Sequence, residues 1–259
     1  MNLSAVDALS TRLIGLGDWF HRTTVFAEYI QQTSPELAAC IFSELVVSAV
    51  LMRRKKYTVA LQSAFFAVLL ERWGSDHRTH TREAAAAWQD DVALAFLVNP
   101  TVDEDDEHFS VPAYNSERTL TLGERKALAA TPQRRNIEMA LFDPHPAVMG
   151  RLLDNPRVTE PDMIRIAARA KVPSIILAAI ATHPRWRERL SVTAALAQNR
   201  RLPANIGLTL LPFLSRPTLV NISGDQRLHD SLRSAAALLL SLVTRNNHGC
   251  AGPPGVRSH

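Results

Sequence analysis

The stretch 76–83 holds the side chains whose types and spacing come closest to a metal or catalytic site. His77 and His80 stand three residues apart, with Asp76 and Glu83 on either side. Residues three and four apart share one face of a helix, and imidazole and carboxylate groups on such a face are ligands for zinc. No second group of ligands accompanies them in the sequence, so a solvated start of a helix is the simpler interpretation.

The other candidates for catalytic chemistry are weaker. His145 and His183 each precede a proline, where capping or turn roles are more usual than catalysis. The acidic run 103–107 lacks the glycine and the spaced ligands of a calcium loop. The sequence contains no nucleophile elbow, phosphate loop, dinucleotide-binding turn or zinc-protease motif. We therefore predict a protein that is not an enzyme and uses no cofactor or metal. An enzyme with an unrecognised site among the N-terminal helices stays open as an alternative.

Arginine is the residue type that the sequence does concentrate. Residues 1–112 carry 9 basic and 15 acidic residues, whereas residues 113–245 carry 19 basic and 10 acidic ones. Only Lys126 and Lys171 among those 19 are lysines. Arginine binds carboxylates and phosphates through a planar fork of N–H donors. Six arginines near helix starts and turns are the predicted partner-binding residues: Arg157, Arg185, Arg189, Arg200, Arg201 and Arg216.

The spacing of these arginines suggests one positive surface. Arg185 and Arg189 are four residues apart and are predicted to share one helix face. Arg157, Arg200 and Arg201 fall in turns, and equivalent turns line up in stacked repeats, so they would form a positive strip. The predicted partner is another protein with an acidic surface, and the alternative is a nucleic-acid backbone. Helix capping and solubility, without any partner, would explain the same residues.

The elements that must position these residues are short helices broken at regular intervals. Prolines 156, 173, 184 and 203 mark the breaks, since proline is tolerated in the first turn of a helix but not in its interior. The segment 155–169 matches 199–213 at an offset of 44 residues. A second match, at an offset of 42, relates 183–196 to 225–238 and pairs Trp186 with Leu228.

Two-part units that recur every 42–44 residues are typical of stacked helix pairs. Helices this short are unstable alone in water, so neighbours must bury one another's apolar faces. We expect Trp186 to be an apolar anchor of the resulting core. The other expected core residues are Ile164, Ile176, Ile180, Leu190, Leu196, Leu208 and Leu238. The predicted fold is therefore all-α, with a right-handed α-solenoid of short paired helices preceded by an N-terminal helical domain.

The phrases that punctuate these helices carry a resemblance to a known class. "DPHPAV" at 143–148, "NPRVTE" at 155–160 and "HPRW" at 183–186 resemble phrases in bacterial HEAT-like and leucine-rich-repeat-variant helical-repeat proteins. The resemblance covers about residues 119–240. It implies a right-handed helical solenoid and a role as a protein-interaction scaffold, and it implies no catalytic residue. Some leucine-rich-repeat-variant proteins hold an iron–sulfur cluster through cysteines ahead of the repeats, but this chain lacks that cysteine cluster.

We predict four segments along the chain: an N-terminal helical domain over 1–98, an acidic linker over 99–117, a helical repeat domain over 118–245 and a disordered tail over 246–259. In the first segment, a helix opens at Ser34 and Pro35 and closes at the basic run 53–56. The helix that follows it should complete an antiparallel hairpin. The five successive acidic residues 103–107 repel one another, so this stretch is expected to be exposed and to form the linker.

The predicted compartment is the cytoplasm. The two cysteines, Cys40 and Cys250, make no disulfide framework, and Cys40 is expected to be a small buried residue of an apolar helix. The first 20 residues lack the pattern of a signal peptide. The apolar runs 38–52 and 58–70 fall short of the ~20 residues of a membrane span, so no span is predicted. The sequence predicts no particular oligomeric state.

Overall fold

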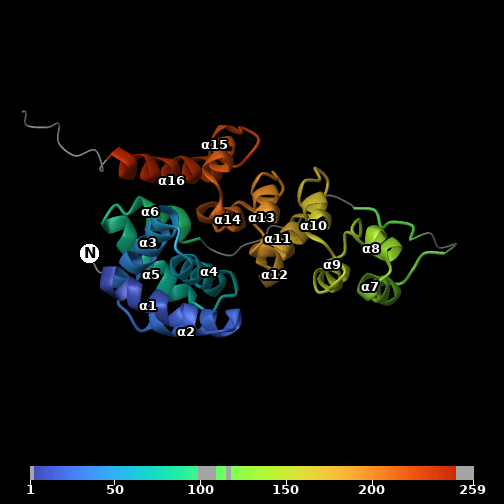
Figure 1. Cartoon of the computed structure of the whole chain (residues 1–259), viewed down its shortest axis with the longest axis horizontal. Coiled ribbons are helices and arrows are strands. Elements are labelled where there is room, and N and C mark those ends of the chain that lie inside the picture. The colour runs from blue at the N-terminus through green and yellow to red at the C-terminus, as the bar shows by residue number, and fades with distance from the viewer. Residues whose placement is uncertain (1–2, 99–108, 115–117, 249–259) are drawn as a thin grey trace, which may run out of the picture. The chain divides into compact units, whose positions relative to one another are not determined.

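The computed structural model describes residues 3–98, 109–114 and 118–248, and within these ranges every regular element is a helix (Figure 1). The all-α class predicted from the sequence is confirmed. Most of the predicted linker and of the predicted tail lies outside the described residues. The chain divides into two compact units. The first unit comprises residues 1–97, 215–224 and 233–259, and the second comprises residues 98–214 and 225–232.

This division differs from the predicted domain boundary near residue 245. The segments 215–224 and 233–248 group with the N-terminal helices rather than with the helices of the second unit. The physical reason lies in their apolar residues. Leu219 and Leu240 line the same hollow as Val50, which lies near the carboxyl end of the helix 35–52. These two segments therefore extend the first unit and are not a last repeat.

The first unit is built around two long apolar helices. It contains α1 (Leu3–Gly15), α2 (Trp19–Gln31), α3 (Pro35–Met52), α4 (Lys55–Leu69), α5 (Ser75–Ala87), α6 (Asp91–Phe96), α15 (Arg216–Gly224) and α16 (Asp230–His248), the last from Arg233 onward. Helix α3 packs against α4, α5 and α6, and α1 and α2 pack against α4. The predicted hairpin of α3 and α4 is therefore present.

Helix α3 begins as its sequence predicts. The hydroxyl of Ser34 accepts a hydrogen bond from the N–H of Leu37 (3.3 Å), and Pro35 is the first helical residue. By length and composition alone α3 is the one helix among the described residues that could cross a membrane, and half of its 18 residues are buried. The expectation that Cys40 is buried is wrong. Its side chain is exposed, because it lies on the face of α3 that borders an open hollow.

Trp73 anchors the core of the first unit and is fully buried. Its indole lies 6.1 Å from the ring of Phe26 and 6.0 Å from the ring of Phe42, measured between centroids. The indole N–H donates to Nδ1 of His77 (2.9 Å), and Nε2 of His77 lies 3.0 Å from the carbonyl oxygen of Thr33. Both ring nitrogens of His77 thus help to hold α5 on the core.

Three helices of the first unit end in a left-handed residue that is not glycine: α3 at Arg53, and α4 and α5 at two further residues. Glu71 follows α4 with φ 52°, and Gln89 follows α5 with φ 56°. After these two residues the next N–H reaches back to the helix, from Arg72 to the carbonyl of Ala67 and from Asp90 to the carbonyl of Ala85, both at 2.9 Å. A side chain in this conformation costs roughly 1–2 kcal/mol.

Replacing Glu71 or Gln89 by glycine is expected to raise the free energy of unfolding by about 0.5–1 kcal/mol. Glycine removes the strain of the left-handed conformation. Its larger loss of chain entropy on folding offsets part of the resulting gain in stability. Urea denaturation at neutral pH measures the change. The matched control is Ala86→Gly, which places glycine in right-handed backbone of α5 and should lower stability by about 0.5–1 kcal/mol. Loss of stability in all three variants would contradict the prediction.

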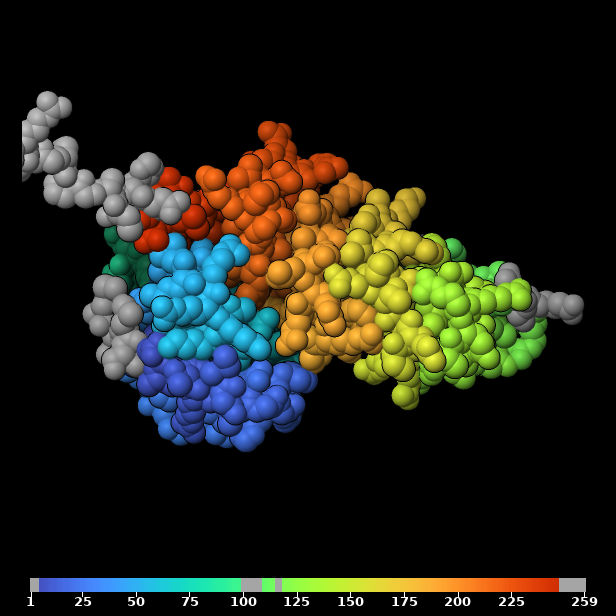
Figure 2. Space-filling view, in the orientation of Figure 1, coloured from blue at the N-terminus to red at the C-terminus, as the bar shows by residue number. Residues whose placement is uncertain are grey.

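The second unit is a series of shorter helices. It contains α7 (Leu122–Ala130), α8 (Arg134–Ala140), α9 (Pro146–Leu153), α10 (Glu160–Ala167), α11 (Ser174–Thr182), α12 (Pro184–Arg187), α13 (Leu190–Ala197), α14 (Ala204–Leu208) and the 3-10 turn Leu211–Phe213. Helix α9 packs against α7 and α11, and α13 packs against α10, α11 and α12. Figure 1 shows these helices following one another in chain order, and Figure 2 shows their surfaces as successive bands from green to orange.

The predicted core of the second unit is largely present. Trp186 is 1% exposed, as expected of an apolar anchor. The expected core residues Ile176, Ile180, Leu196 and Leu208 are buried, and Ile164 is half-buried. Leu190 contradicts the prediction with 64% exposure, because a new helix starts at this residue and turns its side chain outward. Leu238 is half-buried and belongs to the first unit.

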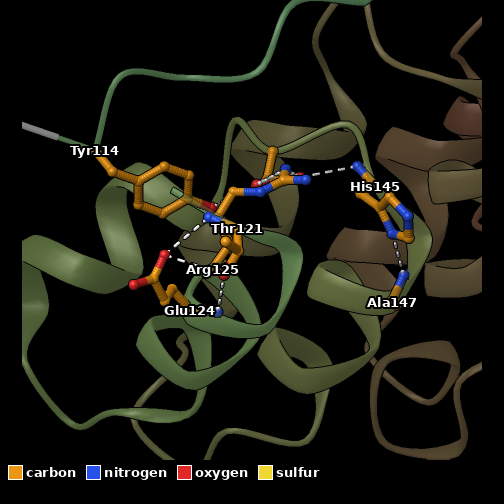
Figure 3. Close-up of polar contacts among 7 residues, drawn as sticks. Tyr114, Thr121, Glu124, Arg125, His145 and Ala147 are labelled. Atoms are coloured by element: carbon orange, nitrogen blue, oxygen red, sulfur yellow. Dashed lines mark hydrogen bonds and ion pairs between the residues drawn. The ribbon is translucent and has the colours of Figure 1, made fainter. Parts of the chain in front are cut away.

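A buried ion pair joins the first turns of the second unit (Figure 3). The carboxylate of Asp143 accepts hydrogen bonds from Nη1 of Arg125 (2.7 and 2.8 Å), from the hydroxyl of Tyr114 (2.6 Å) and from the N–H of His145 (2.9 Å). Burial raises the pKa of the Tyr114 phenol, and the bond to Asp143 raises it further. Tyr114 falls within the predicted exposed linker, so at this residue the prediction is wrong.

Candidate functional site

Asn155, in the turn after α9, fastens its helix to the end of α7. Its side-chain N–H₂ donates to the carbonyl oxygens of Ala129 and Thr131, both at 2.8 Å. Its side-chain oxygen accepts from the N–H of Arg157 at 2.9 Å. The residue is 4% exposed. The last carbonyls of a helix have no partner within it, so this one side chain both satisfies the end of α7 and fixes the following turn.

Asn199, in the turn after α13, repeats the same three bonds 44 residues later. Its N–H₂ donates to the carbonyl oxygens of Ala167 (2.6 Å) and Arg169 (2.8 Å) at the end of α10, and its oxygen accepts from the N–H of Arg201 (3.0 Å). The sequence offset of 44 between Asn155 and Asn199 is therefore also a repeat of geometry. We call the two surroundings the Asn155 module and the Asn199 module.

The Asn155 module is closed by an aromatic residue and an arginine. The indole N–H of Trp186 donates to the carbonyl oxygen of Leu153 at 3.0 Å. The guanidinium of Arg185 lies 4.2 Å from the Trp186 ring and donates to the carbonyl oxygens of Asn155 and Val158, both at 3.0 Å. Trp186 fills the space beside the turn, and Arg185 covers the tryptophan ring.

The Asn199 module is open at the corresponding place. Leu228 stands where the 42-residue match places Trp186, and Arg227 stands where it places Arg185. Arg227 pairs with Asp225 through two bonds, of 2.9 and 2.7 Å, and its side chain is 79% exposed. A groove of about 490 Å³ remains beside Leu228. Its walls include four alanines (Ala167, Ala168, Ala170 and Ala195), three arginines (Arg169, Arg200 and Arg227) and no carboxylate.

The six predicted partner-binding arginines lie in different surroundings. Arg157, Arg189 and Arg200 are exposed, whereas Arg185 and Arg201 are half-buried. The Nε of Arg201 donates to the carbonyl oxygen of Val172 (2.9 Å), so Arg201, like Arg185, holds the backbone of a neighbouring turn. Arg216 is the first residue of α15 and belongs to the first unit. Of the six, only Arg200 lines the groove.

The prediction that Arg185 and Arg189 share a helix face is also wrong. Helix α12 ends at Arg187, and Arg189 precedes the first residue of α13. Arg187 is 3% exposed, donates to the carbonyl oxygens of Ala181 (3.3 Å) and Thr209 (2.8 Å), and has its pKa lowered to about 9 by burial. Between α12 and α13 the chain turns, and the guanidinium of Arg187 binds carbonyl oxygens inside the unit.

Sequence reasoning missed two of the three arginines that line the groove. Arg227 could have been found, because the 42-residue match aligns it with Arg185, which was a predicted partner-binding residue. Arg169 had no such signal. Its place in the groove follows from the carbonyl that it offers to Asn199, and this contact joins residues 30 apart in the chain.

Helix α10, which forms one wall of the groove, is fixed at its start by Asp162. This carboxylate accepts from the N–H of Thr159 (3.0 Å) and the hydroxyl of Thr159 (2.7 Å), and it pairs with the guanidinium of Arg134 (2.7 Å). Thr159 is therefore the N-cap residue of α10. The hydrogen bonds from Arg134 and then from Thr159 lower the pKa of Asp162 to about 2.

Asp162→Asn is expected to lower the free energy of unfolding by about 2 kcal/mol at neutral pH, the equivalent of that pKa shift. Because the pKa is lowered on folding, the contribution is complete above the unfolded value near 4 and is lost as the pH falls through about 2. The stability gap between wild type and variant should therefore narrow between pH 4 and pH 2 in urea denaturation. Glu160→Gln, in the same first turn, is the control and should show a smaller gap. A gap for Asp162→Asn that stays constant to pH 2 would contradict the prediction.

The histidines of the stretch 76–83 are not brought together. His77 is engaged at both ring nitrogens, as described above, and His80 is exposed on α5. Among the described residues, no three side chains of His, Cys, Asp or Glu lie close enough to hold a metal ion. The described residues therefore show no metal-binding cluster that would support the alternative of an enzyme in the N-terminal helices.

The groove of the Asn199 module is the strongest candidate site, because it combines a hollow of defined volume with arginines from three different turns. Comparison with protein-family models, with curated proteins and with solved structures finds no match to this chain.

Proposed function

We propose that this chain is a non-enzymatic scaffold whose second unit is a right-handed α-solenoid and binds an acidic segment of another protein. Support for the solenoid comes from the two modules, in which asparagines 44 residues apart make the same set of hydrogen bonds. It also comes from helices that pack on others two or three places along the chain, as α7 packs on α9, α9 on α11 and α10 on α13. Units that cannot bury their apolar faces alone stack in this way and leave an extended face for a partner.

The single observation that carries the binding role is the groove beside Leu228. Arg169, Arg200 and Arg227 line it, and Arg200 and Arg227 are exposed at its edge. Charge-assisted hydrogen bonds between guanidinium and carboxylate groups are stronger than neutral ones and favour a planar, bidentate geometry. A positive lining without a carboxylate therefore selects carboxylates in a partner over ammonium groups.

Binding of a labelled peptide of about 15 residues rich in Asp and Glu, followed by fluorescence anisotropy with the full chain, tests the proposal. The double variant Arg200→Glu, Arg227→Glu should bind at least tenfold more weakly, a loss of about 1.4 kcal/mol or more. The matched control is Arg135→Glu, Arg151→Glu, which makes the same charge change at exposed positions of the same unit. Equal binding by both double variants would mean that the groove is not the contact surface.

Single-stranded nucleic acid is a second candidate because of one exposed ring. Phe142 is 44% exposed, and the guanidinium groups of Arg169 and Arg165 lie 4.5 and 5.6 Å from its centre. Exposed aromatic rings beside arginines stack on bases in single-stranded nucleic-acid sites. If this candidate is right, Phe142→Ala weakens oligonucleotide binding several-fold, and affinity falls steeply with rising salt. No binding at low salt removes it.

A further inference from the structure

The two modules share one frame, and three of the positions at which their residues differ lie around one space. The carbonyl oxygens that accept from the asparagines come from Thr131 in one module and Arg169 in the other. The offset of 44 pairs Pro156 with Arg200, and the offset of 42 pairs Trp186 with Leu228. At these three positions the Asn199 module has two arginines and no tryptophan, and all three residues line the groove.

In the Asn155 module the space is occupied by the chain itself. The Trp186 indole is buried to 1% exposure, and Arg185 stacks on it and binds two carbonyl oxygens of the turn. In the Asn199 module Leu228 is buried and lines the groove. Arg227 pairs with the carboxylate of Asp225 and does not stack on a ring of the described residues. The groove therefore has the surroundings of a tryptophan site without the tryptophan.

We propose that this groove takes a bulky apolar side chain, preferably a tryptophan, from a partner peptide whose flanking residues are acidic. The inference rests on the proposed function, since it names which acidic segment the scaffold binds. The methyl groups of Ala167, Ala168 and Ala195 give an apolar wall. An aromatic side chain buries 150–250 Å² in such a site, the largest apolar contribution that one residue can make. Around it, Arg200 and Arg227 pair with the flanking carboxylates.

Tryptophan is the preferred occupant because a tryptophan fills the matched position of the Asn155 module. There the indole of Trp186 is buried, and its N–H donates to the carbonyl oxygen of Leu153, the last residue of α9.

Two peptides that differ in one residue test this inference on the full chain: a 12-residue peptide with one central Trp between Asp and Glu residues, and the same peptide with Ala in place of Trp. Wild type should bind the Trp peptide at least tenfold more tightly. Leu228→Trp, which fills the groove as Trp186 does, should bind both peptides equally. Leu228→Met keeps the volume of the side chain and should keep the preference.

Ala168→Phe provides a second way to block the groove if Leu228→Trp does not fold, because Ala168 is an exposed residue of its edge. It should remove the preference as well. Equal affinity of wild type for the two peptides, or an unchanged preference in both blocked variants, would overturn the inference. So would a single-stranded oligonucleotide that displaces the Trp peptide and loses affinity in the same blocked variants.

The proposed function and this inference fail in different ways. If wild type binds both peptides equally and Arg200→Glu, Arg227→Glu weakens both, the acidic-partner proposal stands and the tryptophan inference is wrong. If the charge variant binds both peptides as wild type does, the groove is not the acidic-partner site, and both proposals are wrong.

Discussion

Asp143→Ala is expected to lower the free energy of unfolding of the second unit by about 3–5 kcal/mol, the cost of removing one partner of a buried ion pair. Asp143 is 2% exposed, and its carboxylate accepts hydrogen bonds from Arg125, from Tyr114 and from the N–H of His145 in the turn before α9. Without it, the guanidinium of Arg125, whose side chain is 9% exposed, is left charged and buried without its carboxylate partner.

Hydrogen exchange of the amides in α7 and α9 measures this change within the second unit, without contribution from the first. The exchange protection of both helices should fall together, because Arg125 comes from α7 and Asp143 directly precedes α9. Tyr114→Phe removes only one of the bonds and should cost about 1 kcal/mol.

Asp154→Ala is the matched control, since Asp154 is also an aspartate of the second unit and pairs with His183 at 3.2 Å. Its side chain is 75% exposed, so its pair is screened by water and should contribute less than about 1 kcal/mol. Similar losses in Asp143→Ala and Asp154→Ala would show that burial does not set the strength of the first pair.

The features that the sequence predicts correctly are those decided by neighbours along the chain. The N-cap at Ser34 and the helix starts at Pro35 and Pro184 depend on residues within one helical turn. The burial of Trp186 follows from an apolar residue repeated at a fixed offset. These signals are sufficient for the all-α class and for most helix positions.

The features that the sequence misses depend on contacts across the unit. No proline or glycine marks the break between α12 and α13 at Glu188 and Arg189. The break is stabilised by Thr193, whose hydroxyl lies 3.0 Å from the carbonyl oxygens of both Arg187 and Arg189, and by the buried guanidinium of Arg187. A periodic pattern counts apolar positions and does not record that a charged residue is buried.

The arginine surface shows the same limit. An exposed arginine and one that binds backbone carbonyl oxygens have the same letter in the sequence, and Arg200 and Arg201 are adjacent examples of each. The match of Trp186 with Leu228 was evidence for a shared apolar core. The difference in size between those two side chains indicates a site only in the structure. There the asparagine bonds show that Trp186 and Leu228 lie in corresponding modules.

Trp186→Leu should convert the closed module into a copy of the open one, and it is expected to lower the free energy of unfolding by about 2–4 kcal/mol. The change removes the bond to the Leu153 carbonyl and leaves unfilled space in a core site. Arg185 also loses the ring on which it stacks at 4.2 Å. Hydrogen exchange of α9 and α11 measures the loss, since both helices pack against one another at this end of the module.

Trp88→Leu is the control, because Trp88 is 54% exposed and its replacement should change stability by less than about 0.5 kcal/mol. The informative comparison is Trp186→Leu with Leu228→Trp. If one frame underlies both modules, the first variant loses stability by emptying a filled site, and the second loses little or gains by filling an empty one. A large loss in Leu228→Trp together with a small one in Trp186→Leu would mean that the two spaces are not equivalent and that the shared asparagine bonds do not define a repeated site.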